Sequence, residues 1–188
     1  AGHGSVAREK AGIEHLPREL RPFLRRLGVT FGALDVFAPA LLKPAARGAL
    51  HAAGIDRRPL APAMPSVLAG RSGLPTGYRL AGPQAIRVDL AEKLVRAAHE
   101  ARTRAGARQF ALDPALALST GLTRESWERV LAAAGFRVSR ARALPKEALG
   151  PPAPDRWSWR PARPARQPEA VRPQAAGAFA ALADLTGR

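Results

Sequence analysis

Residues 112–142 read LDPALALSTGLTRESWERVLAAAGFRVSRAR and contain the pattern from which the rest of the fold can be worked out. An apolar helix is expected over residues 114–119, and the turn that follows at 120–122 contains a glycine. Thr123 is a good N-cap residue for a second helix, because its hydroxyl can accept a hydrogen bond from the first turn. Gly135 is expected to end that helix. The stretch therefore predicts two short helices joined by a tight turn.

The second helix and the residues after it indicate a winged helix-turn-helix. Four apolar residues of the helix are spaced so that they share one buried face: Trp127, Val130, Leu131 and Ala134. Residues 136–138 then alternate apolar and basic side chains, as a strand does. Two helices joined by a glycine-containing turn and followed directly by a strand are typical of this motif.

The residues before this stretch complete the same domain. Residues 85–88 predict a short strand, and Asp89 is expected to cap a helix over residues 90–104. In a winged helix this is the first helix, which packs behind the helix-turn-helix. Residues 109–111 can supply the short strand that precedes the second helix.

Two further strands, over residues 136–142 and 155–160, predict a wing joined by a turn-rich loop. Trp157 and Trp159 alternate with other residues in the second strand, so they point to the same side, between flanking arginines. That side is either a nucleic-acid surface or the cover of a core, and the sequence leaves both open.

The chain divides into five segments of different composition. They are a flexible lead-in over 1–15, a helical platform over 16–55, a Pro- and Gly-rich linker over 56–81, a winged-helix-like domain over 82–160, and a Pro- and Arg-rich tail over 161–188 with a short amphipathic end. The platform is expected to begin with an amphipathic helix whose apolar stripe is buried: Leu16, Leu20, Phe23, Leu24 and Leu27. The expected fold class is α+β, mainly α, with a helical platform and a winged-helix-like domain that carries a short β-wing.

Two polar side chains in apolar surroundings have simple structural explanations. Asp35 lies in residues 29–37, an apolar run that predicts either a strand or an irregular core loop. It is expected to be a turn or capping residue rather than a general base. Tyr78, beside a glycine-rich turn, is expected to anchor packing rather than to stack on a base.

The formal net charge of +15, from 30 basic and 15 acidic residues, points to a polyanionic partner, with a solvated basic surface as the alternative. The chain has no cysteine, and its four histidines never fall in a metal-ligand spacing, so neither a metal nor another cofactor is expected. No apolar run is long enough to span a bilayer and the N-terminus has no hydrophobic leader, so we expect a cytoplasmic protein with no membrane partner. No arrangement of catalytic side chains is recognisable, so neither enzyme activity nor a small-molecule substrate is expected.

The candidate nucleic-acid-binding residues lie on the second helix of the motif and on the wing. They are Arg124, Arg129, Arg137, Arg140, Arg142, Arg156, Trp157, Trp159 and Arg160. Glu125 and Glu128 lie on the same helix and weaken the case for reading bases. Contacts from the wing to the phosphate backbone are therefore expected.

Five short segments, taken in order, carry a resemblance to a known family. They are GVTFG at 28–32, DVFAPALLKPA at 35–45, GPQAIRVD at 82–89, GFR at 135–137 and FAAL at 179–182. Together they resemble the C-terminal part of large alphaproteobacterial superfamily 2 helicases, which are related through their motor domains to the RNA helicase of the mitochondrial degradosome. The resemblance implies an accessory nucleic-acid-binding region whose partner is an upstream ATP-dependent motor. This chain has no G-x-x-x-x-G-K-[ST] loop, so ATP hydrolysis by that mechanism is not expected of it.

Two other functions stay open at this point. A winged helix can be a protein-interaction module that docks on the motor or on another partner, because fold alone does not decide function. A free-standing DNA-binding regulator is a weaker hypothesis, since the linker and the long lead-in do not suggest its usual dimer helix. The sequence does not distinguish DNA from RNA.

Overall fold

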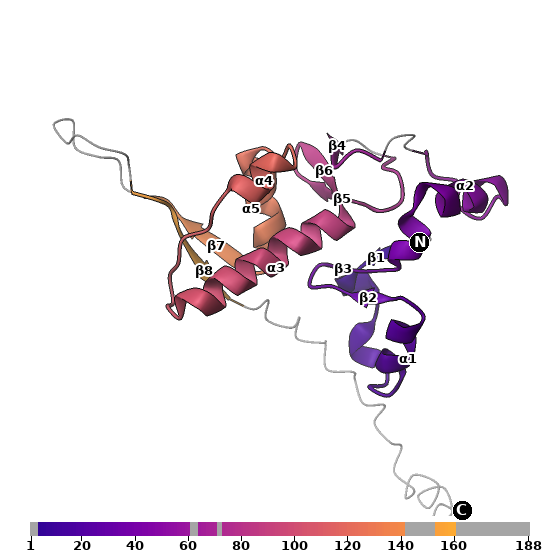
Figure 1. The fold of residues 1–188 in the computed structure, drawn as a ribbon, viewed down its shortest axis with the longest axis horizontal. Helices are drawn as coiled ribbons and strands as arrows, with labels where there is room; N and C mark the ends of the chain where they lie inside the picture. Colours follow the sequence, from indigo (N-terminus) through magenta and orange to yellow (C-terminus); the bar gives the residue numbers. More distant parts are fainter. Residues whose placement is uncertain (1–3, 61–63, 71–72, 142–152, 161–188) are drawn as a thin grey trace, which may run out of the picture.

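The computed structural model of the chain describes residues 4–60, 64–70, 73–141 and 153–160. Within these residues it contains five α-helices and three small antiparallel sheets, so the predicted α+β class is confirmed. The longest helix runs from a two-stranded ribbon at one end of the molecule toward the other two sheets (Figure 1). None of the described helices combines the length and the apolar character needed to cross a membrane.

The N-terminal sheet has the strand order β1-β3-β2, with β1 at Ser5–Ala7, β2 at Thr30–Phe31 and β3 at Asp35–Phe37. All three residues of β1 pair antiparallel with β3, and the side chain of Ile13 is buried soon afterwards. We predicted a flexible lead-in over residues 1–15. Residues 5–7 of this segment are instead part of the sheet, because their backbone groups are paired with those of β3.

Between β1 and β2 the chain forms two single-turn 3-10 helices, η1 (Arg8–Lys10) and η2 (Ile13–His15), and then α1 (Leu20–Arg26). The predicted burial of the apolar stripe on this helix is wrong. Three of its residues are 46–63 % exposed: Leu20, Phe23 and Leu27. The helix begins later than the periodicity predicted, contains no buried residue, and lies at the periphery of the molecule (Figure 1).

The 3-10 helix η3 (Pro39–Leu42) and α2 (Pro44–Ala52) follow β3. We predicted a single helix here that Pro44 kinks or splits, and the structure splits it. Pro44 occupies the first position of α2, where its missing N–H removes no helical hydrogen bond. The predicted helical platform over 16–55 is therefore a mixed unit of one small sheet and short helices.

Residues 56–81 are not the surface linker that we predicted. They contain β4 (Val67–Ala69) and β5 (Tyr78–Ala81), which flank β6 (Gln84–Arg87) in a second antiparallel sheet. A two-residue turn joins β5 to β6, and Gly82 takes its first position with a φ of +72°, which favours glycine.

Buried polar contacts hold this segment in place. The Thr76 hydroxyl donates a hydrogen bond to the buried Asp56 carboxylate at 2.6 Å, and the Tyr78 hydroxyl donates to the backbone oxygen of Pro65 at 2.6 Å. The ring of Tyr78 is buried, which confirms its predicted packing role. Composition indicated a linker because it reports prolines and glycines, whereas the contacts that fold the segment join residues far apart in the sequence.

The helix α3 (Val88–Ala105) begins directly after β6. The predicted N-cap, Asp89, is wrong: Arg87 occupies the cap position, and Asp89 lies in the first turn and accepts a hydrogen bond from the Arg87 Nε at 3.0 Å. The buried face of α3 lies at the centre of the main core. The other large side chains of this core include Ile86, Phe110, Trp127, Leu131, Phe136 and Trp157.

The stretch that opened the sequence analysis forms the predicted succession of elements, which are α4 (Ala115–Ser119), α5 (Arg124–Ala133), β7 (Phe136–Ser139) and β8 (Arg156–Trp159). Thr123 caps α5 as predicted, because its side-chain oxygen accepts a hydrogen bond from the Ser126 N–H. Phe110 forms an isolated antiparallel bridge with Trp157, at the place where a short strand was predicted. Most of the predicted wing loop and all of the predicted tail lie outside the described residues.

Glu92 joins the N-terminal sheet to α3. Its carboxylate accepts hydrogen bonds, at 2.7, 2.7 and 2.8 Å, from three successive backbone N–H groups in the turn before β3 and at its start: those of Ala33, Leu34 and Asp35. Gly32 leaves room for this carboxylate, because a Cβ at that position would overlap it. The platform and the winged-helix-like domain, which we predicted as separate segments, are therefore in direct contact.

Candidate nucleic-acid interface

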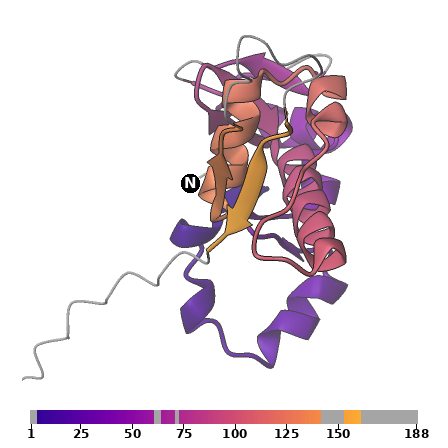
Figure 2. The same ribbon diagram turned by 90° about the vertical axis from the view of Figure 1, so that its left-hand side faces the viewer.

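The ribbon formed by β7 and β8 has two different faces. Cross-strand partners share a face, and the register alternates apolar pairs with polar pairs. The apolar pairs face the core: Phe136 with Trp159 and Val138 with Trp157. The polar pairs face outward: Arg137 with Ser158 and Ser139 with Arg156. Figure 2 shows the ribbon, orange to yellow, from its open side.

Three exposed arginines lie on the outer face of the ribbon: Arg137, Arg156 and Arg160, which we call the ribbon arginines. In the described part of the chain, none of them forms a salt bridge. Arg137 donates from one Nη to the backbone oxygens of Ala132 and Phe136, both at 3.0 Å. Its other N–H groups remain available, and a guanidinium fork suits phosphate oxygens.

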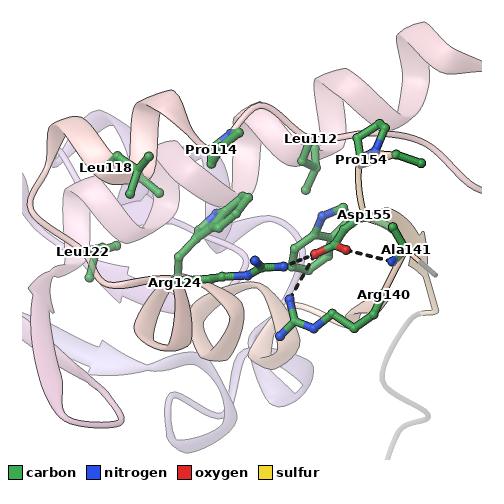
Figure 3. A pocket seen from close by; sticks show the side chains of 13 residues that line it. Leu112, Pro114, Leu118, Leu122, Arg124, Arg140, Ala141, Pro154 and Asp155 are labelled. Atoms are coloured by element: carbon green, nitrogen blue, oxygen red, sulfur yellow. Dashed lines mark hydrogen bonds and ion pairs between the residues drawn. The ribbon is translucent and has the colours of Figure 1, made fainter. Parts of the chain in front are cut away.

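Two of the predicted arginines lie on the other side of the ribbon, where acidic residues neutralise them (Figure 3). Arg140 binds Glu128 through both Nη atoms at 2.6 Å and binds Asp155 at 3.0 Å. Arg124 binds Glu128 at 3.0 Å and also binds Asp155. Two guanidinium groups thus meet two carboxylates. This four-residue network carries no net charge.

The carboxylates of the four-residue network are held in their ionised form. Burial would raise the pKa of Glu128, but hydrogen bonds from Arg140 and Arg124 outweigh it and lower that pKa below its ordinary value. The backbone N–H of Ala141 and the Arg140 side chain lower the pKa of Asp155. At neutral pH, therefore, the charges of Arg124 and Arg140 are balanced by carboxylates of the protein itself, although both guanidinium groups are exposed.

The other two predicted arginines do not add to the ribbon face either. Arg129 pairs with Glu125 one turn earlier on α5, at 2.9 Å, and both side chains are about 60 % exposed. Such an exposed helical pair contributes only about 0.3–0.5 kcal/mol, so it can open when a stronger partner arrives. Arg142 lies outside the described residues.

The two tryptophans serve the core rather than an open stacking surface. Trp157 is 3 % exposed and packs against Trp127, with ring centroids 5.3 Å apart. The Trp159 indole N–H donates to the backbone oxygen of Ala134 at 3.0 Å, and the Arg102 guanidinium lies 4.4 Å from its ring centroid. Of the two explanations left open by the sequence, packing against the core is the one that the structure supports.

Two arginines outside the predicted set extend the basic surface. Arg102, in the last turn of α3, and Arg108, just after that helix, line a hollow of about 360 Å³ together with Trp159. Arg160 follows Trp159 directly, so the basic residues at the end of α3 lie next to the ribbon arginines. The sequence could indicate that Arg102 is on the solvent side of its helix, but only the tertiary structure brings that end of the helix beside the β7–β8 ribbon.

An apolar groove of about 680 Å³ opens beside the four-residue network, between α4, the start of α5 and the ribbon (Figure 3). Its main apolar lining consists of Leu112, Leu118, Leu122, Trp127, Pro154 and Trp157. These residues come from separate elements, so no single sequence motif predicts the groove.

The N-terminal part contains a buried ion pair. Asp35 is 4 % exposed and forms a salt bridge with Arg79 at 3.0 Å. Burial raises the pKa of the Asp35 carboxyl, and Arg79 offsets only part of that effect. The predicted turn or capping role is therefore replaced by a pairing across 44 residues of sequence. Among the described residues, no three His, Asp or Glu side chains form a group that could hold a metal ion.

In comparisons with known proteins, no protein family, characterised protein or solved structure gave a significant match to the chain. The helicase resemblance of the short segments stays a prediction. The functional evidence lies in the distribution of charge over the ribbon and its neighbours.

Proposed function

We propose that this chain is a non-catalytic nucleic-acid-binding module of the winged-helix type, which holds a phosphate backbone against its ribbon arginines. The observation that carries the proposal is the separation of charge across the ribbon. Three exposed arginines without a described acidic partner lie on the outer face. The nearby carboxylates, Glu128 and Asp155, are paired with other arginines on the inner face. A row of guanidinium groups with no competing carboxylate is what backbone contacts need.

The order of elements supports the winged-helix assignment. α3, the Phe110 bridge, α4, α5 and the β7–β8 ribbon follow one another as first helix, short strand, helix-turn-helix and wing do. The isolated bridge between Phe110 and Trp157 supports this order, because it pairs residue 110 with β8. In this arrangement α5 is the second helix of the helix-turn-helix.

We favour contact between the wing and the phosphate backbone over recognition of bases by side chains of α5. The charged side chains on the outward side of α5 cancel one another, since Arg124 pairs with Glu128 and Arg129 with Glu125. Such a surface has little attraction for a phosphate-lined groove. The ribbon arginines, with Arg102 and Arg108 beside them, form the more basic surface.

We further propose that the module works in the cytoplasm beside the motor domains of an ATP-dependent helicase, as the resemblance of its short segments implies. Glycines in these segments have clear structural roles. Gly32 makes room for Glu92, Gly82 forms the β5–β6 turn, and Gly135 passes too close to the Arg160 carbonyl for a side chain. These roles explain why the segments that carry the resemblance need glycine at these positions in this chain.

The test is a salt titration of affinity for short single- and double-stranded DNA and RNA, starting at about 50 mM salt. Replacing the three ribbon arginines by alanine removes about three phosphate contacts, so the slope of log affinity against log salt should flatten by about two to three. A matched control removes the same charge elsewhere: Arg18→Ala, Arg26→Ala and Arg57→Ala, all exposed positions away from the ribbon. The control should change the slope by much less.

Equal changes in the two triple variants would mean that the net charge, and not the ribbon, attracts the polyanion. An unchanged slope in the ribbon variant, with intact circular dichroism, would reject the proposal. The preferred nucleic acid is the one for which the ribbon variant loses most.

One observation favours a second function, the protein-interaction module. The apolar groove beside the four-residue network has the size and character of a site for side chains of another segment. If the wild-type chain binds no nucleic acid at about 50 mM salt, this function becomes the better explanation.

A further inference from the structure

The apolar groove is open on the surface that contains Leu118. That side chain is 59 % exposed at the edge of the groove, while Leu122, Trp127 and Trp157 form its buried floor. Water is poorly stabilised in this hollow of about 680 Å³, because its lining is mainly leucine and tryptophan and offers few hydrogen bonds. Apolar side chains that enter it would remove that surface from water.

The guanidinium groups are the most exposed part of the four-residue network at the rim of the groove. Arg124 and Arg140 are 61 % and 53 % exposed, whereas their partners Glu128 and Asp155 are 17 % and 21 % exposed beneath them. An approaching segment therefore meets guanidinium groups first. This disfavours arginine-rich segments and disfavours a second copy of a chain whose net charge is +15.

One segment of the chain's own sequence fits both requirements. We propose that the groove binds residues 179–185, FAALADL, of the same chain. Phe179, Leu182 and Leu185 are three residues apart, so a helical turn would place them on one side. In residues 173–187 the only charged side chain is Asp184, so this is the part of the sequence after residue 160 that suits a rim whose most exposed groups are guanidinium groups.

The chain between the ribbon and this segment is long enough to reach the groove. The extended chain from Asp155 to Arg160, which includes β8, spans about 17 Å at about 3.3 Å per residue. The 18 residues from 161 to 178 have a root-mean-square length of about 24 Å as a flexible coil and about 56 Å as polyproline II. A tether of this length gives a local concentration of the order of millimolar, so weak apolar contacts suffice for occupancy.

The absence of cysteine from the whole chain allows a direct test by disulfide formation. Leu118→Cys is combined with Leu182→Cys in the full chain, and the rate of oxidation is followed by gel shift and mass spectrometry. The control pair is Leu80→Cys with Leu182→Cys, because Leu80 on β5 is 58 % exposed and does not line the groove. The same rates measured in denaturing urea give the contribution of the tether alone.

We expect the groove pair to close within one chain at least about tenfold faster than the control pair, with the difference lost in urea. Adding Phe179→Asp and Leu185→Asp to the groove pair should slow it to the control rate. Equal rates in the folded protein would overturn the proposal. A covalent dimer as the main product would assign the groove to a second copy, and faster closure of Leu118→Cys with Leu149→Cys would assign it to the residues between the two wing strands; either result also overturns it.

Discussion

Asp35 illustrates how a buried charge in this chain is stabilised by one partner and left partly unsatisfied. Its Oδ1 accepts from Arg79 at 3.0 Å, while its buried Oδ2 has no hydrogen-bond partner among the described residues. Because burial disfavours the ionised form, the pKa of this carboxyl lies above its ordinary value of 3.8. The folded protein therefore holds this proton more tightly than the unfolded chain does.

The sign of the resulting pH dependence follows from linkage. The contribution of Asp35 to stability is greatest below the unfolded pKa and is lost as pH rises through the raised pKa of the folded state. Asp35→Asn removes the charge and keeps an oxygen that can accept from Arg79. We expect the variant to be at least as stable as the wild type at neutral pH and to lose that advantage on acidification. Urea unfolding at several pH values between about 3 and about 7 measures the difference; an advantage of the wild type that grows with pH would contradict it.

Gly32 and Gly48 form a matched pair for testing the contact between the N-terminal sheet and α3. A Cβ on Gly32 would overlap the Glu92 carboxylate, whereas a Cβ on Gly48, inside α2, meets no atom within 4 Å. Gly32→Ala should lower the free energy of unfolding by about 1–3 kcal/mol, because the carboxylate and the turn must move apart. Gly48→Ala should be neutral or raise it by up to about 1 kcal/mol through helix propensity. Urea denaturation monitored by tryptophan fluorescence compares the stabilities of the two variants. Equal effects would mean that a Cβ at position 32 does not strain the contact with Glu92.

At the level of helices and strands, periodicity and capping predicted the described elements from β6 onward and little of what lies before β6. The Thr123 cap, the buried face of α5 and the start of β7 are local features, so the sequence specifies them. Strands of two to four residues such as β2 and β4 show no period, and their place depends on pairing with residues elsewhere. The α1 stripe has the right spacing for burial but meets no core, which spacing alone cannot reveal.

The same limit applies to the candidate site. The sequence predicted that arginines on the wing face outward, and strand alternation does place Arg137 and Arg156 on the outer face. It could not predict that Arg124 and Arg140 share two carboxylates, because Asp155 reaches them from the other strand of the ribbon. Trp157 and Trp159 share a face as expected, and the core behind that face decides their role.

The four-residue network gives a prediction in which removing an acid improves binding. Glu128→Gln leaves Asp155 as the one carboxylate facing Arg124 and Arg140, so the network gains one net positive charge. If the nucleic acid lies along this side of the wing, affinity at low salt should rise and the salt slope should steepen by about one. Glu14→Gln, which makes the same charge change at an exposed position in the N-terminal part, is the control. An unchanged slope for Glu128→Gln would restrict the contact to the outer face of the ribbon.

At the scale of the whole molecule, the ribbon separates exposed arginines that have no described acidic partner from paired charges. Glu92 helps to join the N-terminal part of the chain to α3. The division of charge leaves one basic face, made by the ribbon arginines with the end of α3, and one groove with paired charges at its rim. The strongest polar part of the joint between these two halves is Glu92, whose carboxylate accepts three backbone N–H groups. The Asp35–Arg79 ion pair and the burial of Leu34 in the main core add to it. Hydrogen bonds to a charged acceptor each contribute about 1.5–3 kcal/mol, so this joint is strong enough to couple the unfolding of the two halves.

Hydrogen exchange can test that coupling directly. In the wild type, the amides of Leu34 and Asp35, which donate to Glu92, should open with nearly the same free energy as the amide of Val95 in the core of α3. Glu92→Gln places an amide NH₂ near these donors and weakens the joint, so Leu34 and Asp35 should lose protection while Val95 keeps most of its own. Glu100→Gln, at an exposed position two turns further along α3, removes the same charge without touching the joint and should change neither. Early opening of Leu34 and Asp35 in the wild type would instead show that the N-terminal sheet unfolds as an independent unit.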